Sequence, residues 1–213
     1  MTCLDHHRIR QLMVGAFAST LAIPVLWMIT PMAAQAAACT QIVSGAHSGV
    51  INVAANQKLC LRGAVQDGAV NVAPNGALSV VSSTITGAVT LKAGYTELEF
   101  CGSKTVRGAI SATGGRGSVV IGGSGLLGAL LCPANTIDGA VTLDANKAGV
   151  QLARSGVAGA VTASANLGGT TISGNQIGGK LTCSANIPAP TNAGVPNAVA
   201  GGRVGQTCAV LSF

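Results

Sequence analysis

The chain has 213 residues, of which 8% are charged and 2% aromatic, and its formal net charge is +6. The basic residues are scattered, so the sequence lacks the basic stripe that marks a nucleic-acid-binding surface. No Gly-x-x-x-x-Gly-Lys-Ser/Thr stretch occurs among the 30 glycines, which excludes that kind of phosphate-binding loop. The glycines are therefore expected to serve turns.

Residues 1–38 have the layout of a secretory signal peptide. A basic start precedes an uncharged apolar run over residues 11–30, and small residues follow up to position 38. We therefore expect a secreted or cell-surface protein. Two alternatives remain open. The run is close to the roughly 20 residues that span a bilayer, so an uncleaved leader would act as a membrane anchor. The second alternative is a lipoprotein acylated at Cys39, although Ala36 stands where a lipoprotein signal usually has Leu.

Beyond the leader, a motif of one aliphatic residue, any residue and glycine recurs about every 20 residues. It occupies 85–87, 106–108, 126–128, 137–139, 157–159, 177–179 and 199–201. One interval, from Gly128 to Gly139, is much shorter than the others. A fixed period of this length indicates a repeat architecture.

Each period contains two triplets in which apolar residues flank a middle residue. The first triplets start at Ile51, Val70, Val89, Ile110, Leu130, Val141, Val161 and Leu181, and the second at Leu59, Leu78, Leu98, Val119, Val150 and Thr170. Strict alternation predicts strands, because successive side chains point to opposite faces. The Gly-, Asn- and Pro-containing segments between the triplets are typical of turns. Phe100 falls at an inward position.

Two short strands and a third inward position in each period predict an all-β fold, a single-stranded parallel β-helix of roughly eight coils. Coils stacked about 4.8 Å apart would give a rod roughly 40 Å long. The alternative is an antiparallel β-sandwich, whose strands would not repeat the Gly-Ala-Val-Thr phrase in register. The solenoid is expected over residues 39–186. Residues 187–213 form a Pro/Gly-rich cap, because prolines cannot continue a ladder.

Six cysteines remain after the leader, an even number in an exported chain, so disulfides are expected. Cys39 and Cys60 are about one coil apart, and so are Cys183 and Cys208 with the proline-rich loop added. We predict these two pairs, with Cys101–Cys132 bracing the irregular region. Six cysteines allow 15 pairings, so spacing alone leaves the connectivity open.

The closing segment carries three recognisable strings, Ile177–Asn186, Pro188–Asn192 and Gly205–Cys208. They resemble the ending of small secreted bacterial repeat proteins of the kind found in actinobacteria, which are rich in Gly, Ala and Val. The resemblance covers most of the mature chain. It implies a β-solenoid and an exported location, and it carries no catalytic residues. Bactofilin-like polymer-forming proteins are similar in coil pattern, but they lack this leader and cysteine set.

The sequence predicts no catalytic residue, metal site or cofactor. Pairs of acids such as Glu97 and Glu99 do not make the group of three that a calcium-dependent polysaccharide lyase needs. His47 is the one histidine after the leader, and we expect it in a surface turn. A polysaccharide-active enzyme therefore stays the least favoured function.

The middle residues of the first triplets predict an outward row of small hydroxyl and amide groups, flanked by alanines. This possible contact face consists of Asn52, Asn71, Thr90, Ser111, Thr142, Thr162 and Thr182. We expect a non-enzymatic structural or cell-surface interaction protein. The alternative is a module that binds a repetitive polymer, such as cell-wall polysaccharide or ice. An envelope polymer or another copy of the chain are the expected partners.

Overall fold

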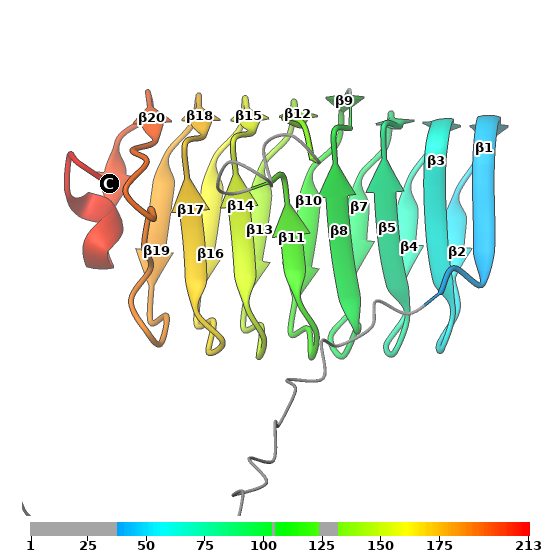
Figure 1. Cartoon of the computed structure of the whole chain (residues 1–213), viewed down its shortest axis with the longest axis horizontal. Helices are drawn as coiled ribbons and strands as arrows, with labels where there is room; N and C mark the ends of the chain where they lie inside the picture. The colour runs from blue at the N-terminus through cyan, green and yellow to red at the C-terminus, as the bar shows by residue number, and fades with distance from the viewer. Residues whose placement is uncertain (1–37, 104, 124–131) are drawn as a thin grey trace, which may run out of the picture. The chain divides into compact units, whose positions relative to one another are not determined.

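The structure is a computed structural model and describes residues 38–103, 105–123 and 132–213. These residues form two parallel sheets, of 13 and 8 strands, and one short 3-10 helix, η1 (Gln206–Ala209). Neighbouring strands come from segments about 20 residues apart, as where Val141 pairs with Val161. The fold is therefore a β-solenoid of about eight coils, as predicted (Figure 1).

Face 1 of the solenoid is the 8-stranded sheet; its first seven strands are built from the first triplets, and the eighth, β21, comes from the segment predicted as the cap. Its strands are β2 (Ile51–Val53), β4 (Val70–Val72), β7 (Val89–Leu91), β10 (Ile110–Thr113), β13 (Val141–Asp144), β16 (Val161–Ser164), β19 (Leu181–Ser184) and β21 (Arg203–Val204). Their pairing is parallel and in register, with Ile51 opposite Val70 and Val161 opposite Leu181. Equivalent side chains therefore form straight columns across the coils.

The 13-stranded sheet turns a corner and supplies the other two faces. Face 2 contains β5 (Ala77–Val81), β8 (Glu97–Cys101), β11 (Val119–Ile121), β14 (Val150–Ala153) and β17 (Thr170–Ser173). Face 3 contains β6 (Thr84–Ile85), β9 (Thr105–Val106), β12 (Thr136–Ile137), β15 (Gly156–Val157), β18 (Gln176–Ile177) and β20 (Ala198–Val199). β1 (Gln41–Ser48) and β3 (Lys58–Asp67) run through both faces, since β3 pairs with β5 and with β6.

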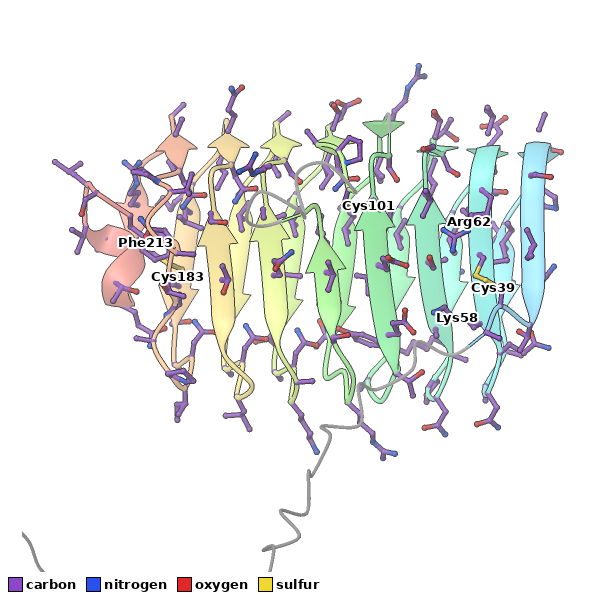
Figure 2. All side chains as sticks on the ribbon, viewed as in Figure 1. Cys39, Lys58, Arg62, Cys101, Cys183 and Phe213 are labelled. Carbon is purple, nitrogen blue, oxygen red and sulfur yellow. A yellow bond between two sulfur atoms is a disulfide. The ribbon has the colours of Figure 1, made fainter. Side chains whose placement is uncertain are left out.

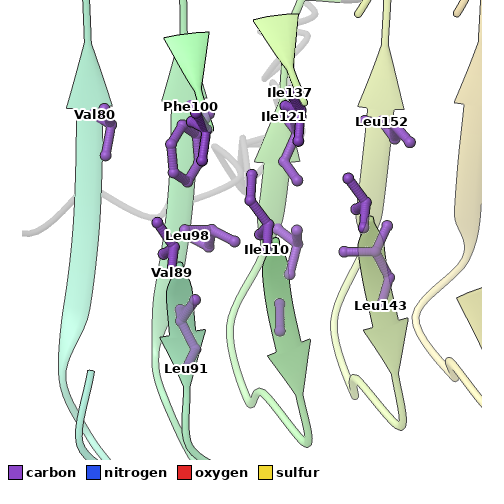
Figure 3. Packing of buried hydrophobic residues seen from close by; sticks show 14 of the residues in the cluster. Val80, Val89, Leu91, Leu98, Phe100, Ile110, Ile121, Ile137, Leu143 and Leu152 are labelled. Carbon is purple, nitrogen blue, oxygen red and sulfur yellow. The ribbon is translucent and has the colours of Figure 1, made fainter. Parts of the chain in front are cut away.

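The interior is a narrow column of aliphatic side chains contributed by all three faces. Val89, Val141 and Val161 are completely buried, and Phe100 lies inside as predicted. Figure 3 shows the labelled side chains of neighbouring coils projecting into this interior. Burial of one such side chain contributes roughly 1.5–3 kcal/mol. A single coil has no neighbour against which to bury its residues, so stability comes from stacking.

The sheets have no rung for one of the predicted coils, because the strands on either side of it pair directly with each other. The triplet predicted at Leu130 lies largely outside the described residues. Ile110 pairs directly with Val141, and Val106 pairs directly with Ile137. The chain between β11 and β12 is thus an insertion at the corner between faces 2 and 3.

Two columns of buried polar side chains run inside the corners, and sequence analysis did not predict them. In the first, Asn146, Asn166 and Asn186 follow β13, β16 and β19 and are almost completely buried. Each comes directly after an alanine with a φ of about +50°, such as Ala165 at 51°. That left-handed residue ends the strand and turns the next side chain inward.

Each asparagine of this column bonds to the coils on both sides. Asn166 Oδ1 accepts from the backbone N–H of Asn146 at 3.1 Å and from Asn146 Nδ2 at 3.0 Å. Asn166 Nδ2 donates to Leu143 O at 3.0 Å and to Asn186 Oδ1 at 2.8 Å. The Asn166 amide is thereby bonded on both sides within the protein, as buried polar groups require.

Tyr95 occupies the interior two coils earlier and joins the same network. Its hydroxyl donates to Asn146 Oδ1 at 2.7 Å, and the side chain is completely buried. Burial raises the pKa of the Tyr95 phenol above its usual value. The hydroxyl therefore stays protonated and remains a donor. The glycine at position 115 leaves space for the ring, because a Cβ there would lie 2.3 Å from Tyr95 Cζ.

The second polar column lies at the corner between faces 2 and 3. Its members are buried serines and asparagines at equivalent places in successive coils: Ser83, Ser103, Asn135, Ser155, Asn175 and Asn197. Asn175 Oδ1 accepts from the backbone N–H of Ser155 at 2.9 Å, and Asn175 Nδ2 donates to Leu152 O at 2.9 Å. The column ties the backbone of successive coils together at this corner, although Ser103 Oγ has no hydrogen-bond partner among the described residues.

All three predicted cysteine pairs are at disulfide distance, with Cα–Cα separations of 5.8 Å for Cys39–Cys60, 4.7 Å for Cys101–Cys132 and 5.9 Å for Cys183–Cys208. Figure 2 shows the Cys39 bond on the outside of face 2. Cys101 closes the end of β8, and Cys132 ends the insertion before β12. The disulfides therefore brace the first coil, the irregular corner and the C-terminal segment.

The Cys183–Cys208 bridge attaches η1 to β19, and replacing both cysteines by alanine is expected to lower the free energy of unfolding by about 3 kcal/mol. The reason is that the bridge closes a loop with a sequence separation of 25. Urea unfolding gives the change in stability. Hydrogen exchange is expected to show faster exchange in residues 198–213 and little change in β4 to β10. Uniform acceleration along the whole solenoid would contradict a local role for this bridge.

Candidate contact face

The predicted row of hydroxyl and amide side chains forms one continuous column on the outside of face 1. Strand pairing places Asn52 opposite Asn71, Ser111 opposite Thr142, and Thr162 opposite Thr182. All seven members are exposed or half-buried: Asn52, Asn71, Thr90, Ser111, Thr142, Thr162 and Thr182. The column continues without a gap from β10 to β13, because Ser111 pairs directly with Thr142.

The local reason for this row is the alternation within each triplet. Val141 and Leu143 point into the interior, so Thr142 between them must point outward. Threonine is favoured at such positions because its branched side chain fits a pleated, half-buried surface. Adjacent amides also bond along the column, since Asn71 Nδ2 donates to Asn52 Oδ1 at 3.0 Å.

A row of alanines runs parallel to the column. Each alanine directly precedes the inward residue that begins a strand of face 1, as Ala69 precedes Val70. The members of the row are Ala69, Ala88, Ala109, Ala140 and Ala160. Their carbonyls are occupied by the preceding coil, as where the Val89 N–H donates to Ala109 O at 2.9 Å. Lys92 and Asp144 directly follow the triplets of their coils, and Lys180 takes the place of an alanine in the coil of Thr182. In the coils of the five alanines the strip between the two rows is uncharged, with coils repeating about every 4.8 Å.

Three of the acidic residues, Glu97, Glu99 and Asp67, bond to other side chains of the solenoid. Glu97 forms an ion pair with Lys58 at 2.7 Å, and Glu99 accepts from Ser79 Oγ at 2.6 Å. Asp67 accepts from Thr86 Oγ1 at 2.8 Å. Among the described residues there is no group of three or more His, Cys, Asp or Glu placed to hold a metal ion.

His47 is exposed as predicted, but it lies in strand β1, so the prediction of a turn is wrong. It pairs with Gln66 at an inward position of the first coil, and its Nδ1 is 2.9 Å from Gln66 Oε1. His47 is exposed because that coil is the end of the described stack. The sequence Gly-Ala-His-Ser is typical of a turn, which explains the wrong prediction. The position of His47 about one period before Gln66 would have indicated that the two residues pair in adjacent coils.

Face 3 carries a shallow groove that sequence analysis did not predict. Its volume is about 630 Å³, and its floor is formed by small residues of the last four coils, including Gly156, Ala158 and Gly178. Thr136, Asp138 and Gln176 supply its polar groups. The groove exists because the outward residues of β15 and β20, Gly156 and Ala198, are small. A single carboxylate at its margin offers no catalytic pair.

The described residues contain no helix that is long and apolar enough to cross a membrane. Comparison of the chain with protein-family models, with curated proteins and with solved structures gave no match in any of the three.

Proposed function

We propose that the protein is an exported, non-enzymatic structural or surface-interaction protein, in which the solenoid is a stiff spacer with a regular outer face. The support comes from the construction of the fold. Parallel coils in register, buried amide columns and three disulfides produce a surface whose side chains keep fixed spacings. Disulfides of this kind are typical of proteins in oxidising compartments outside the cytosol.

A second candidate function is binding of a repetitive polymer through the contact face, and one observation favours it. The seven hydroxyl and amide side chains stand in one in-register column, and five of them have an uncharged alanine beside them. A rigid row of this kind has its groups already positioned, so little conformational entropy is lost when a regular ligand binds. Cell-wall polysaccharide and ice both present such repeating surfaces.

The contact face is tested by changing Thr90, Thr142 and Thr162 together to lysine and measuring retention on purified cell-wall polysaccharide. We expect at least a tenfold loss of binding, because three long charged side chains would hold the ligand away from the strip. The same proteins are assayed for inhibition of ice recrystallisation, which distinguishes the two kinds of surface.

The matched control carries the same added charge on other faces, at Thr136, Thr171 and Gln176, which are also exposed or half-buried. It is expected to bind like the unmodified protein. Binding that survives the face 1 substitutions, or that falls equally in the control, would rule out the contact face. A protein that binds neither polymer nor ice would leave the spacer function as the favoured one.

A further inference from the structure

The two ends of the described stack are built differently. At the C-terminal end, η1 and the last residues cover the coil, with Cys208 completely buried and Phe213 only 5% exposed. The Asn197 N–H donates to Phe213 O at 2.9 Å, which holds this tail in place. At the other end, β1 and β2 are the outermost rungs of residues 38–213, and each pairs with a strand on one side only (Figure 1).

The backbone of this outer rung has hydrogen-bonding capacity that its own sheets do not use. In the ladders, the inward residues bond to the next coil, as where Val70 N–H donates to Ala88 O at 2.9 Å. The outward residues bond to the preceding coil, as where Lys92 N–H donates to Val72 O at 2.9 Å. The outward residues of β1 and β2 have no preceding strand among the described residues. Their N–H and C=O groups therefore point off the end of the stack.

The edge has a short strand, β2, and a register shift between Val43 and Gly45 in β1, but it lacks the charged residues and prolines that most often prevent strand addition. Residues 41–53 contain no Lys, Arg, Asp, Glu or Pro, which are the residues that usually protect an edge. Ile42 and Val50 on this rung are 65% and 56% exposed. An uncharged edge with exposed aliphatic side chains does not repel an identical edge.

We propose that this edge pairs with the same edge of a second copy, so that two solenoids join head to head. A twofold axis perpendicular to the stack sets β1 antiparallel to its symmetry mate, which gives an isologous contact. The covered C-terminal end prevents growth in the other direction. The assembly therefore closes at two copies, and the contact faces of both copies stay exposed along its sides.

The test is sedimentation velocity on the oxidised protein, expressed with its own leader and purified after export, over about 1 μM to 1 mM. We expect a species of twice the chain's mass and nothing larger. Small-angle scattering is expected to give a maximum dimension close to double that of the monomer, because the copies join end to end.

The edge is probed with the double substitution Ala46→Lys and Val50→Lys, which places two positive charges on the outer rung. Its matched control, Val65→Lys with Ala69→Lys, puts the same charges in the same columns one rung further in. The edge variant is expected to weaken dimerisation at least tenfold, whereas the control remains dimeric. The mass of the oxidised protein and its circular dichroism confirm that both variants fold, and Val50→Lys alone replaces the double variant if it does not.

A protein that stays monomeric throughout, a series of species larger than the dimer, or equal weakening in edge variant and control would each overturn the proposal. A dimer that resists the edge substitutions but dissociates when Thr90, Thr142 and Thr162 become lysine would be a lateral contact. That result refutes head-to-head pairing and leaves the contact face in place.

Discussion

Replacing Asn166 by alanine is expected to lower the free energy of unfolding by about 3–5 kcal/mol, because buried polar groups left without partners cost about 1–3 kcal/mol each. The substitution removes the partners of Asn146 N–H, Asn146 Nδ2 and Leu143 O together. All of these groups are buried in the interior between coils. Urea unfolding monitored by far-ultraviolet circular dichroism gives the change.

Two further variants separate the hydrogen bonds from other effects. Asn166→Leu has a similar volume and no hydrogen bonds, and it is expected to cost as much as the alanine variant. Asn71→Ala removes an amide from the outer row, where it makes one exposed bond to Asn52, and is expected to cost less than about 1 kcal/mol. If Asn166→Ala were as mild as Asn71→Ala, the internal amide column would not be what holds this corner.

Replacing Gly139 by alanine is expected to destabilise the solenoid by about 2–4 kcal/mol, at or above the usual range for overpacking. A Cβ at this position would lie 2.5 Å from Ala109 N and from Gly108 C and O. These are backbone atoms of the preceding coil, which cannot move without disturbing the pairing of Ile110 with Val141. The equivalent glycines of other coils are equally close to the backbone beneath them, which explains why the motif repeats. Thermal and urea unfolding measure the loss.

Gly149→Ala provides the matched control for this prediction. A Cβ at Gly149 would have Gly168 O as its nearest neighbour, at 3.7 Å, which is ordinary contact. We expect a change within about 0.5 kcal/mol of zero or slightly stabilising, because alanine reduces the freedom of the unfolded chain. Equal losses at Gly139 and Gly149 would contradict the argument from close approach and would point to a general effect of substituting glycine.

Much of the fold follows from the sequence because its repeating signals are short-range. Alternating triplets such as Val141-Thr142-Leu143 predict strands and also predict which side chain faces outward. A period near 20 predicts which triplets lie in adjacent coils. The contact face is therefore placed by the same pattern that builds the core, and the structure gives the predicted row its continuous register. Whether that row binds anything stays a prediction.

The features that sequence analysis missed depend on contacts between coils. Asn146 and Asn166 resemble turn residues when each is considered alone, and only their 20-residue recurrence distinguishes an inward column. The triplet at Leu130 has the spacing of a strand, yet the pairing of Ile110 with Val141 leaves no rung for it. His47 belongs to a strand because Gln66 binds it from the next coil. In each case the deciding interaction comes from another rung.

The most direct test of stacked parallel coils is the pattern of nuclear Overhauser effects between methyl groups of β13 and β16. The parallel register predicts contacts of Val141 with Val161 and of Leu143 with Ala163, since these pairs lie directly opposite each other. Antiparallel neighbours would instead give contacts of Val141 with Ala163 and of Leu143 with Val161. Observing the second pattern, or finding the Val141 and Val161 methyl groups accessible to a soluble paramagnetic agent, would contradict the solenoid and the contact face that depends on it.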